Sequence, residues 1–540
     1  MSDSAYSIGI DFGTESGRVL LLDLQSGEEV AVGVVPYPHG VIDRALPHNG
    51  ERLPGDWALQ DPDDWVTVLE DGIAYVIAEA GIDPSQVAGL GIDFTSCTVL
   101  PVGSDGTPLC KYEHFRGRRH AWPKLWKHHA AQPIADRLNE VALERGEEWL
   151  SRYGGRISSE WYFPKLIQLW VEDREVYDEA YGFVEATDWV TRWLTGVDVR
   201  QSCTAGYKAM WSPDDGFPSR EYFEAAYPGF DTPTEKLGHK FVPLGTRAGM
   251  LSGEAAQAVG LHGDVAVSVG NVDSFVSVPG AGVESPGTFV TVVGTSICDM
   301  IVDSREVRLP GITGVVRDGI LPGLYGYEAG QAAVGDMLAW FLETFGGTFE
   351  EREAAAARLA PGATGLVALD WFNGNRSILA DADLTGMIAG LTLQSTATEI
   401  YRALLESIAF GNRRIVENFV EHGLEISEIV ACGGIADRSP LLMQLFADTS
   451  GLAVHVPGST EIPARGAALF GAVAAGAFDD IAAAIEATRP GTARTYEPDG
   501  GAKAVYDEVY AVYRGLYGLL GSERVELVHD LKRIRARDQS

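Results

Sequence analysis

The sequence predicts an α/β protein with two domains, and three observations support this. The chain has 540 residues, more than a single hydrophobic core usually organises. Strand-like and helix-like segments alternate in both halves of the chain. A strand, a glycine turn and a second strand occur near the N-terminus and again after residue 282. We therefore expect two related domains with a cleft between them.

The composition excludes several classes of protein. A hydrophobic fraction of 46% is typical of a packed globular chain, and the net charge of −34 repels nucleic acid and anionic lipid. The cysteines are odd in number, five, and never form a C-x-x-C pair, which argues against disulfides and zinc. The N-terminus shows no signal peptide, and no run of 18 uncharged apolar residues occurs. We expect a cytoplasmic protein.

The N-terminal elements form a recognisable order. Strands are predicted over 6–11, 18–24 and 30–37, with turn residues between them. Apolar residues at helical spacing predict a helix over 61–80, which ends at Gly81, and a buried strand follows over 87–94. This order places the helix as a crossover on a mixed sheet.

The middle of the chain, from about 110 to 240, is rich in aromatic residues and short helical pieces, such as 124–131 and 164–172. We interpret it as insertions in the first domain that form a cap over the substrate. His128 and His129 fall in the first of these pieces, where a solvated helix face is favoured over a metal site because adjacent helical residues point apart.

The second half repeats the α/β pattern. Strands are predicted over 288–293, 297–302, 429–432 and 453–456, and helices over 330–344, 399–422, 439–450 and 463–475. A tail begins at about 478 and ends with a helical run over 502–520. We draw the domain boundary near 282, which gives an N-terminal domain of 1–281 and a C-terminal domain of 282–540.

The first motif, GIDFGTESGR at 9–18, has the parts of a phosphate site. Gly13 and Gly17 allow the backbone to approach a phosphate closely, and the Thr14 hydroxyl can donate to phosphate oxygens. Arg18 supplies a planar cation, and Asp11 can hold Mg²⁺ directly or through water. The alternative is an ordinary hairpin turn with an incidental Asp.

A second turn, Gly294-Thr295-Ser296, occupies the equivalent place in the repeated unit. Two such turns that face each other across a cleft could hold a triphosphate from both sides. The pairing therefore favours the phosphate interpretation for both turns.

The Gly433-Gly434 pair stands between a strand and a helix. Two residues without side chains leave room for a flat ring such as adenine. Close packing at a strand-to-helix turn is the stronger alternative for this motif taken alone.

Asp273 follows a short apolar strand over 265–269, just before the expected domain boundary. A carboxylate there could accept the proton of an acceptor hydroxyl in phosphoryl transfer. The alternative is that Asp273 caps the helix that Ser274 begins.

Taken together and in this order, the motifs resemble those of the FGGY family of carbohydrate kinases, over about residues 6–476. Within the family the resemblance is strongest to the members that phosphorylate ribulose. It rests on GIDFTSCT at 91–98, HAWPKLWKHHAAQ at 120–132, the segment 157–165, CTAGYK at 203–208, GLYGYEAGQ at 323–331 and LDWFNGNR at 369–376.

The resemblance implies a two-domain fold of the actin and hexokinase type, which is ribonuclease H-like, with ATP in the interdomain cleft. It implies an N-terminal sugar-binding domain and a C-terminal ATP-binding domain. The expected reaction is ATP-dependent phosphorylation of a ketopentose, with L-ribulose first, as in L-arabinose catabolism. Mg²⁺ is the expected cofactor, and a homodimer is the expected assembly.

Roles are carried over by position. Asp273 matches the general base and Asp11 the carboxylate near Mg²⁺. The phosphate loops are matched by Thr14, Arg18, Gly294 and Thr295, and the adenosine platform by Gly433 and Gly434. The sugar contacts are matched by Ser96, Lys208, Asp273 and Glu328, which are polar, as a polyol requires.

Three departures from the family pattern stand out. Ser96 replaces a common alanine, which we expect to narrow or shift the sugar preference. Arg438-Ser439 replaces a region where Asn often contacts the nucleotide, which we expect to weaken the adenine contact. Ser274 and Phe275 replace a more usual Ala-His pair.

Two other functions remain open from the sequence. The chain could phosphorylate another pentulose or a pentitol, such as xylulose or ribitol, because only the sugar pocket distinguishes these enzymes. It could also be a non-catalytic nucleotide-binding sensor on the same fold, because a fold does not fix a function.

Overall fold

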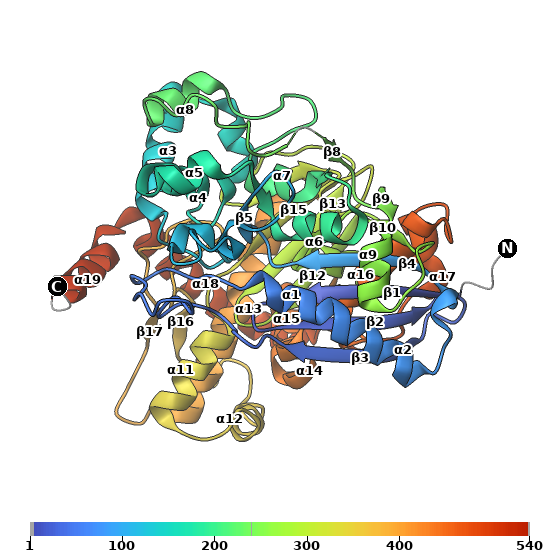
Figure 1. Cartoon of the computed structure of the whole chain (residues 1–540). Coiled ribbons are helices and arrows are strands. Elements are labelled where there is room, and N and C mark those ends of the chain that lie inside the picture. Colours follow the sequence, from blue (N-terminus) through green and yellow to red (C-terminus); the bar gives the residue numbers. More distant parts are fainter. Residues whose placement is uncertain (1–4, 239, 538–540) are drawn as a thin grey trace.

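Two mixed β-sheets of seven strands each form the framework of the computed structural model, which describes residues 5–238 and 240–537 (Figure 1). The first sheet has the order β3-β2-β1-β4-β10-β9, and β11 also pairs with β4. Its strands are β1 (Tyr6–Phe12), β2 (Ser16–Asp23), β3 (Glu29–Pro36), β4 (Val87–Phe94), β9 (Arg247–Met250), β10 (Ala266–Ser268) and β11 (Asn271–Val272).

The second sheet has the order β14-β15-β13-β12-β18-β19-β20. Its strands are β12 (Gly287–Val293), β13 (Ile297–Asp303), β14 (Gly314–Arg317), β15 (Tyr325–Gln331), β18 (Ile426–Cys432), β19 (Ala453–Pro457) and β20 (Thr492–Tyr496).

Five strands of each sheet share one topology. The run β3-β2-β1-β4-β10 corresponds to β15-β13-β12-β18-β19, with antiparallel pairs up to the central strand and parallel pairs after it. The repeat that the sequence predicts is therefore confirmed. As a consequence, the turns β1–β2 and β12–β13 occupy equivalent positions in their sheets.

Two helices lie between the sheets, α10 (Asp273–Gly280) and α16 (Ile462–Ala475). Their apolar residues share one buried cluster with residues of β2, β12 and β13. The contact of α16 with the first sheet is very close, because a Cβ at Gly9 or Gly91 would collide with the carbonyl oxygen of Ala464 or Ala467. Only glycine permits this approach.

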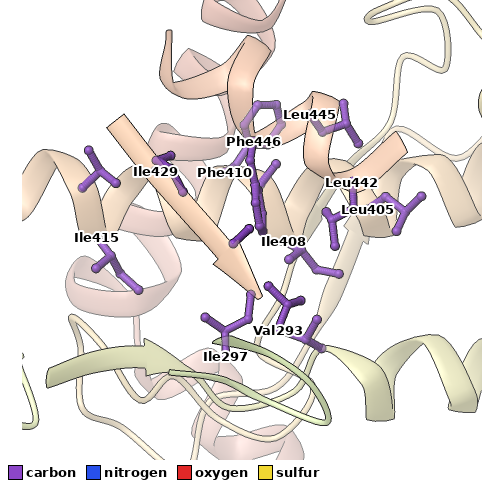
Figure 2. Packing of buried hydrophobic residues seen from close by; sticks show 14 of the residues in the cluster. Val293, Ile297, Leu405, Ile408, Phe410, Ile415, Ile429, Leu442, Leu445 and Phe446 are labelled. Carbon is purple, nitrogen blue, oxygen red and sulfur yellow. The ribbon is translucent and has the colours of Figure 1, made fainter. Parts of the chain in front are cut away.

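Helices cover the outer face of each sheet. The first is covered by α1 (Pro62–Thr67), a π-helical turn (Val68–Gly72), α2 (Ile73–Ala80), α6 (Ala186–Thr195) and α9 (Gly253–Val259). The second is covered by α11 (Gly335–Phe345), α13 (Ala397–Glu421), α15 (Pro440–Ser450) and α18 (Gly500–Gly518). Val293 and Ile297, which flank the second glycine turn, are anchored in this core with Ile408 and Phe446 (Figure 2).

Local signals set the ends of these helices. The Thr396 side chain accepts from the amide of Glu399, whose carboxylate accepts in turn from the amide of Thr396, a capping box that starts α13. At the C-terminal end of α2, Gly81 has a φ of 64°, in the left-handed region, and ends the helix.

A third group of helices is formed by the middle of the chain, where we expected a cap over the substrate. It includes α3 (Gln132–Arg145), α4 (Tyr162–Glu172), α5 (Arg174–Glu179), α7 (Ser202–Lys208) and α8 (Arg220–Ala226). Figure 1 shows α3, α4, α5 and α8 together at one end of the molecule. The aromatic side chains of α4, α5 and α8 share a separate buried cluster, which explains the aromatic composition of this segment.

Residues 124–131 are not helical, so this prediction is wrong. Their amides donate to other segments, as Lys124 does to Val99 O and Leu125 to Ala58 O. We also expected both histidines to face solvent, and for His128 this prediction is wrong. His128 is buried, and its Nε2 is hydrogen-bonded to the Gln168 side chain at 2.8 Å.

Two later predictions need correction. The helix expected over 330–344 begins at Gly335, because Gly330 and Gln331 pair with β13 as the end of β15. The run over 502–520 is helical as α18 and packs on the second sheet, but it is not the last helix, since α19 (Glu526–Arg537) follows.

Two further observations concern the chain as a whole. Within the ranges that the structure describes, no helix is long and apolar enough to cross a membrane. The domain boundary near 282 falls between α10 and β12, and it stays a prediction, since α16 belongs to the second half by sequence but packs on the first sheet.

Candidate active site

Asp273 stands at the start of α10, where the chain leaves β11. β11 pairs in parallel with the end of β4, so Asn271 lies opposite Asp93. The Asp273 carboxylate accepts the amide of Ser274 at 2.6 Å and remains partly exposed. Burial first, and then the negative charge of Asp11, raise its pKa to about 7, while the Ser274 amide and the Lys208 charge act in the opposite direction.

Asp11 and Asp93 lie side by side at the ends of β1 and β4. Arg18 is 3.6 Å from Asp11 and 3.3 Å from Glu461, the residue before α16. Burial raises the pKa of Asp11, and the Arg18 charge opposes the shift. The pKa of Asp93 is raised well above its usual range by burial and then by the charges of Asp11 and Asp273.

Thr14 lies in the β1–β2 turn and is held from two sides. Its carbonyl oxygen accepts from Gln60 Nε2 at 2.9 Å, and its hydroxyl oxygen accepts from the Trp126 indole at 3.1 Å. The hydroxyl proton of Thr14 remains available as a donor. The amide of Gly13, by contrast, closes the turn by donating to Ser16 O at 3.0 Å.

The second turn is built in the same way. Gly294 donates to Ser296 O at 2.9 Å, and the start of α11 is tied to the turn, as the amide of Val334 donates to Thr295 O at 2.9 Å. Thr295 is exposed. Both turns thus present a threonine beside a glycine whose amide is already bonded.

Gly433 and Gly434 differ in what surrounds them. A Cβ at Gly433 would be 2.8 Å from Val293 O, and its φ is 96°, so this glycine is required by close packing next to the second turn. Gly434 is exposed and has nothing within 4 Å of a Cβ position. Only Gly434 leaves open space for a flat ligand.

Lys208 and Glu328 form a buried ion pair of 2.8 Å between α7 and β15. Burial acts to lower the pKa of Lys208, but the Glu328 carboxylate outweighs it, so the lysine stays charged. The ammonium also lies 5.8 Å from the ring of Trp161. The charges of this pair act on Asp273, which places the pair and Asp273 in one site.

Cys298, the second residue of β13, connects the second turn to this site. The charges of Arg376, Glu328 and Asp273 all act on its pKa, which burial raises to about 11. The Arg376 guanidinium donates to Cys298 Sγ at 3.8 Å. The site therefore also contains the Arg376 guanidinium, on the loop that follows β16 (Val367–Leu369).

Ser96 lies in the loop after β4, and its Oγ is buried with no hydrogen-bond partner among the described residues. An unsatisfied buried hydroxyl is costly unless a ligand or water completes it. The loop is closed by a hydrogen bond of 2.8 Å between the side chains of Thr95 and Thr98.

The departures from the family pattern have structural counterparts. Ser439 is buried and caps α15, and its hydroxyl donates to Glu353 at 2.9 Å, so it does not face a ligand. Arg438 is exposed, 4.8 Å from the ring of Phe349. Phe275 is buried against Tyr207, with ring centroids 4.3 Å apart.

The structure thus gathers Asp11, Lys208, Asp273 and Glu328 around one centre, with the second turn linked to it through Cys298. Sequence reasoning missed Asp93, Trp126, Trp161 and Arg376. Asp93 and Arg376 lie within stretches that carry the family resemblance, and their charge was the signal available. Nothing in the sequence singled out Trp126 and Trp161 from the other tryptophans.

Comparisons with known proteins agree over nearly the whole chain. A model described as the FGGY family of carbohydrate kinases, N-terminal domain, matches residues 6–280, and the corresponding C-terminal domain model matches 289–475. The ribulokinase of Anoxybacillus flavithermus is 48% identical over 548 residues, which cover 98% of this chain and 96% of the relative. The ribulokinase of Mycolicibacterium smegmatis is 44% identical over 532 residues, which cover 96% of this chain and 94% of the relative.

Among solved structures, the xylulose kinase of Rhodospirillum rubrum superimposes with a TM-score of 0.78 at 24% identity. The match covers 95% of this chain and 99% of that chain. At this identity the likeness shows the fold, an α/β arrangement of two domains of the actin and hexokinase type, as the sequence predicts.

Proposed function

The chain belongs to the FGGY family of carbohydrate kinases, and from that premise we propose that it transfers the γ-phosphoryl group of ATP to L-ribulose. The product is L-ribulose 5-phosphate. The choice of sugar is supported by relatives named ribulokinase that are 48% and 44% identical over nearly the whole chain.

One observation carries the proposal. Asp273 lies within the electrostatic reach of both Asp11, at the first glycine turn, and the buried Lys208–Glu328 pair. A phosphoryl transfer needs a proton acceptor between the phosphate donor and the acceptor alcohol. We assign this role to Asp273, whose pKa of about 7 suits it to accept the proton of the terminal sugar hydroxyl.

The remaining residues receive their roles from chemistry and position. Lys208 donates to sugar hydroxyls and Glu328 accepts from them, while Ser96 uses the Oγ that lacks a protein partner. Arg18 and the hydroxyls of Thr14 and Thr295 stabilise charge on the phosphates.

The nucleotide base lies on the second half of the chain in this proposal. Gly434 offers the open backbone surface for adenine, and Gly433 holds that surface against the end of β12.

Magnesium fits the acidic residues at the first turn. Within the described ranges, no cluster of three or more His, Cys, Asp or Glu side chains has metal-binding geometry. Magnesium in phosphoryl transfer typically uses one or two carboxylates, water and the phosphates themselves. Asp11 would hold it, with Asp93 beside it, and the bound ion would neutralise charge on the transferring group.

The test is an ADP-formation assay with L-ribulose, D-ribulose, D-xylulose and ribitol. We expect the highest kcat/KM with L-ribulose. A clear preference for D-xylulose or ribitol would overturn the sugar assignment but not the family. Calorimetric binding of ATP and sugar without any product would instead favour a non-catalytic sensor.

Cytoplasmic location and a homodimer remain parts of this proposal. The cytoplasm supplies ATP, the proposed phosphoryl donor. It is also reducing, which agrees with the five cysteines being unpaired. Analytical ultracentrifugation of the purified protein tests the dimer, and a sedimenting mass near 58.0 kDa would contradict it.

A further inference from the structure

Lys165, in α4, is a buried cation that the proposed reaction does not use. Its side chain has no exposed surface, and within the described residues it forms no ion pair. The ammonium instead donates to two backbone carbonyl oxygens, Cys97 O at 2.7 Å and Leu125 O at 2.9 Å. The charges of Glu160 and Glu185 act on it, but neither carboxylate is paired with it. Burial of an unpaired charge is costly, so the presence of a lysine here requires a reason.

The first carbonyl belongs to the loop that carries Ser96. Cys97 follows Ser96 directly and has a φ of 57°, in the left-handed region that non-glycine residues rarely adopt. Such a backbone persists only when its surroundings hold it. The bond from Lys165 and the Thr95–Thr98 side-chain bond are two contacts that do so.

The second carbonyl belongs to the segment that holds the first glycine turn. Leu125 precedes Trp126, whose indole donates to the hydroxyl of Thr14 at 3.1 Å. The two segments are also joined by backbone bonds between Val99 and Lys124 of 3.0 and 2.8 Å. One ammonium therefore ties together the loop of Ser96 and the segment that supports Thr14.

We propose that Lys165 is a positioning residue for the sugar site, whose ammonium fixes the backbone at Cys97 and Leu125 so that Ser96 faces the sugar. The proposal rests on the proposed function in that it takes Ser96 as a sugar contact. Lys165 touches neither substrate, and its effect on the reaction passes through the loop.

A neighbouring lysine provides a matched control. Lys124 is also fully buried, and its ammonium donates to Lys165 O at 3.2 Å, a carbonyl of α4 and not of the loop. Removal of either ammonium should destabilise the protein to a similar degree. Only removal of the Lys165 ammonium should alter the position of Ser96.

The kinetic experiment compares Lys165→Met, Lys165→Arg and Lys124→Met with the wild type. We expect Lys165→Met to raise the KM for L-ribulose by about tenfold or more, because small displacements of a binding group are costly, with the KM for ATP changed much less. Lys165→Arg should restore part of the loss. Lys124→Met should leave both KM values near those of the wild type.

A second measurement needs no sugar. Hydrogen exchange read by mass spectrometry should show lost protection at 95–99 and 124–127 in Lys165→Met, while strands β1 and β12 stay protected. If Lys165→Met yields no folded protein, Lys165→Gln replaces it in both the kinetic and the hydrogen-exchange measurements, because glutamine keeps a donor for one carbonyl.

The outcomes separate the two proposals. Unchanged sugar KM and unchanged exchange at 95–99 would overturn the role of Lys165, as would an equal rise in sugar KM in Lys124→Met. A wild type that phosphorylates no ketopentose would remove the proposed function, and the exchange measurement would then decide whether Lys165 holds the loop.

Discussion

At the scale of single residues, the chemistry depends on how the structure changes the ionisation of Asp273. Burial, and then the charge of Asp11, raise its pKa to about 7. A carboxyl at its ordinary pKa near 4 would be a weak base at neutral pH. The Lys208 ammonium limits the shift, so an ionised form is still accessible where the enzyme works.

The pH dependence of kcat/KM should reveal this ionisation. Asp273 accepts a proton only when ionised, and it becomes protonated as the pH falls through about 7. We therefore expect kcat/KM for L-ribulose to fall about tenfold per pH unit below that value and to level off above it. A flat profile between pH 5.5 and 8 would contradict the assignment.

Substitution of the same residue gives a second prediction. Asp273→Asn keeps the size of the side chain but removes the base, so kcat should fall by about 10²- to 10⁴-fold while ATP binding changes little. Asp479→Asn, an exposed site with the same charge change, serves as the control. Turnover near that of the wild type in Asp273→Asn would remove this residue from its role.

At the scale of elements, the tail helix α18 supports the loop that carries Arg376. The Tyr513 hydroxyl donates to Asp370 Oδ1 at 2.9 Å, and Gln331 Nε2 donates to the other oxygen at 2.9 Å. Asp370 begins the segment that leads to Arg376. A helix that lies beyond the family models at 6–280 and 289–475 thus contributes to the site.

Loss of this contact should be measurable. Tyr513→Phe leaves a buried carboxylate with one donor fewer, so the free energy of unfolding should fall by about 1–3 kcal/mol. Tyr75→Phe, at an exposed position, is the matched control. Equal urea midpoints for the two variants would show that the contact does not stabilise the protein.

Most helices and strands were predicted correctly from the sequence, and the wrong predictions share one cause. The strands β1 to β4 and the helix α2 were predicted because the spacing of apolar residues and the turn residues are local signals. Residues 124–131 look helical but bond to Val99 and Ala58 instead. Residues 330 and 331 were expected in a helix but end β15, because β13 pairs with them. Tertiary partners overrode local preference in both cases.

At the scale of the whole molecule, one buried ion pair connects the two halves. Lys208 comes from the cap of the first half, and Glu328 comes from the second sheet. Both side chains are almost fully buried. The residues that we propose to bind the sugar are therefore shared between the halves, and their arrangement depends on how the halves fit together.

Breaking the pair should destabilise the whole protein. Lys208→Met leaves Glu328 as an uncompensated buried charge, which should lower the free energy of unfolding by about 3–5 kcal/mol. The double variant Lys208→Met/Glu328→Gln removes that charge and should recover much of the loss. Denaturation with urea measures both, and equal stability of the single variant and the wild type would refute the prediction.

The sequence by itself determined the α/β class, the repeat of strand, glycine turn and strand, and, through family resemblance, most of the residues assigned to the site. These are recorded in local patterns and in residue identity at fixed spacing. The tertiary structure alone decided that Asp93 lies beside Asp11, that Arg376 donates to Cys298 and that Lys165 donates to the carbonyl of Cys97. Those contacts join residues that are distant in the sequence. The periodicity of apolar residues shows which face of a helix or strand is buried, but not which residues pack against that face.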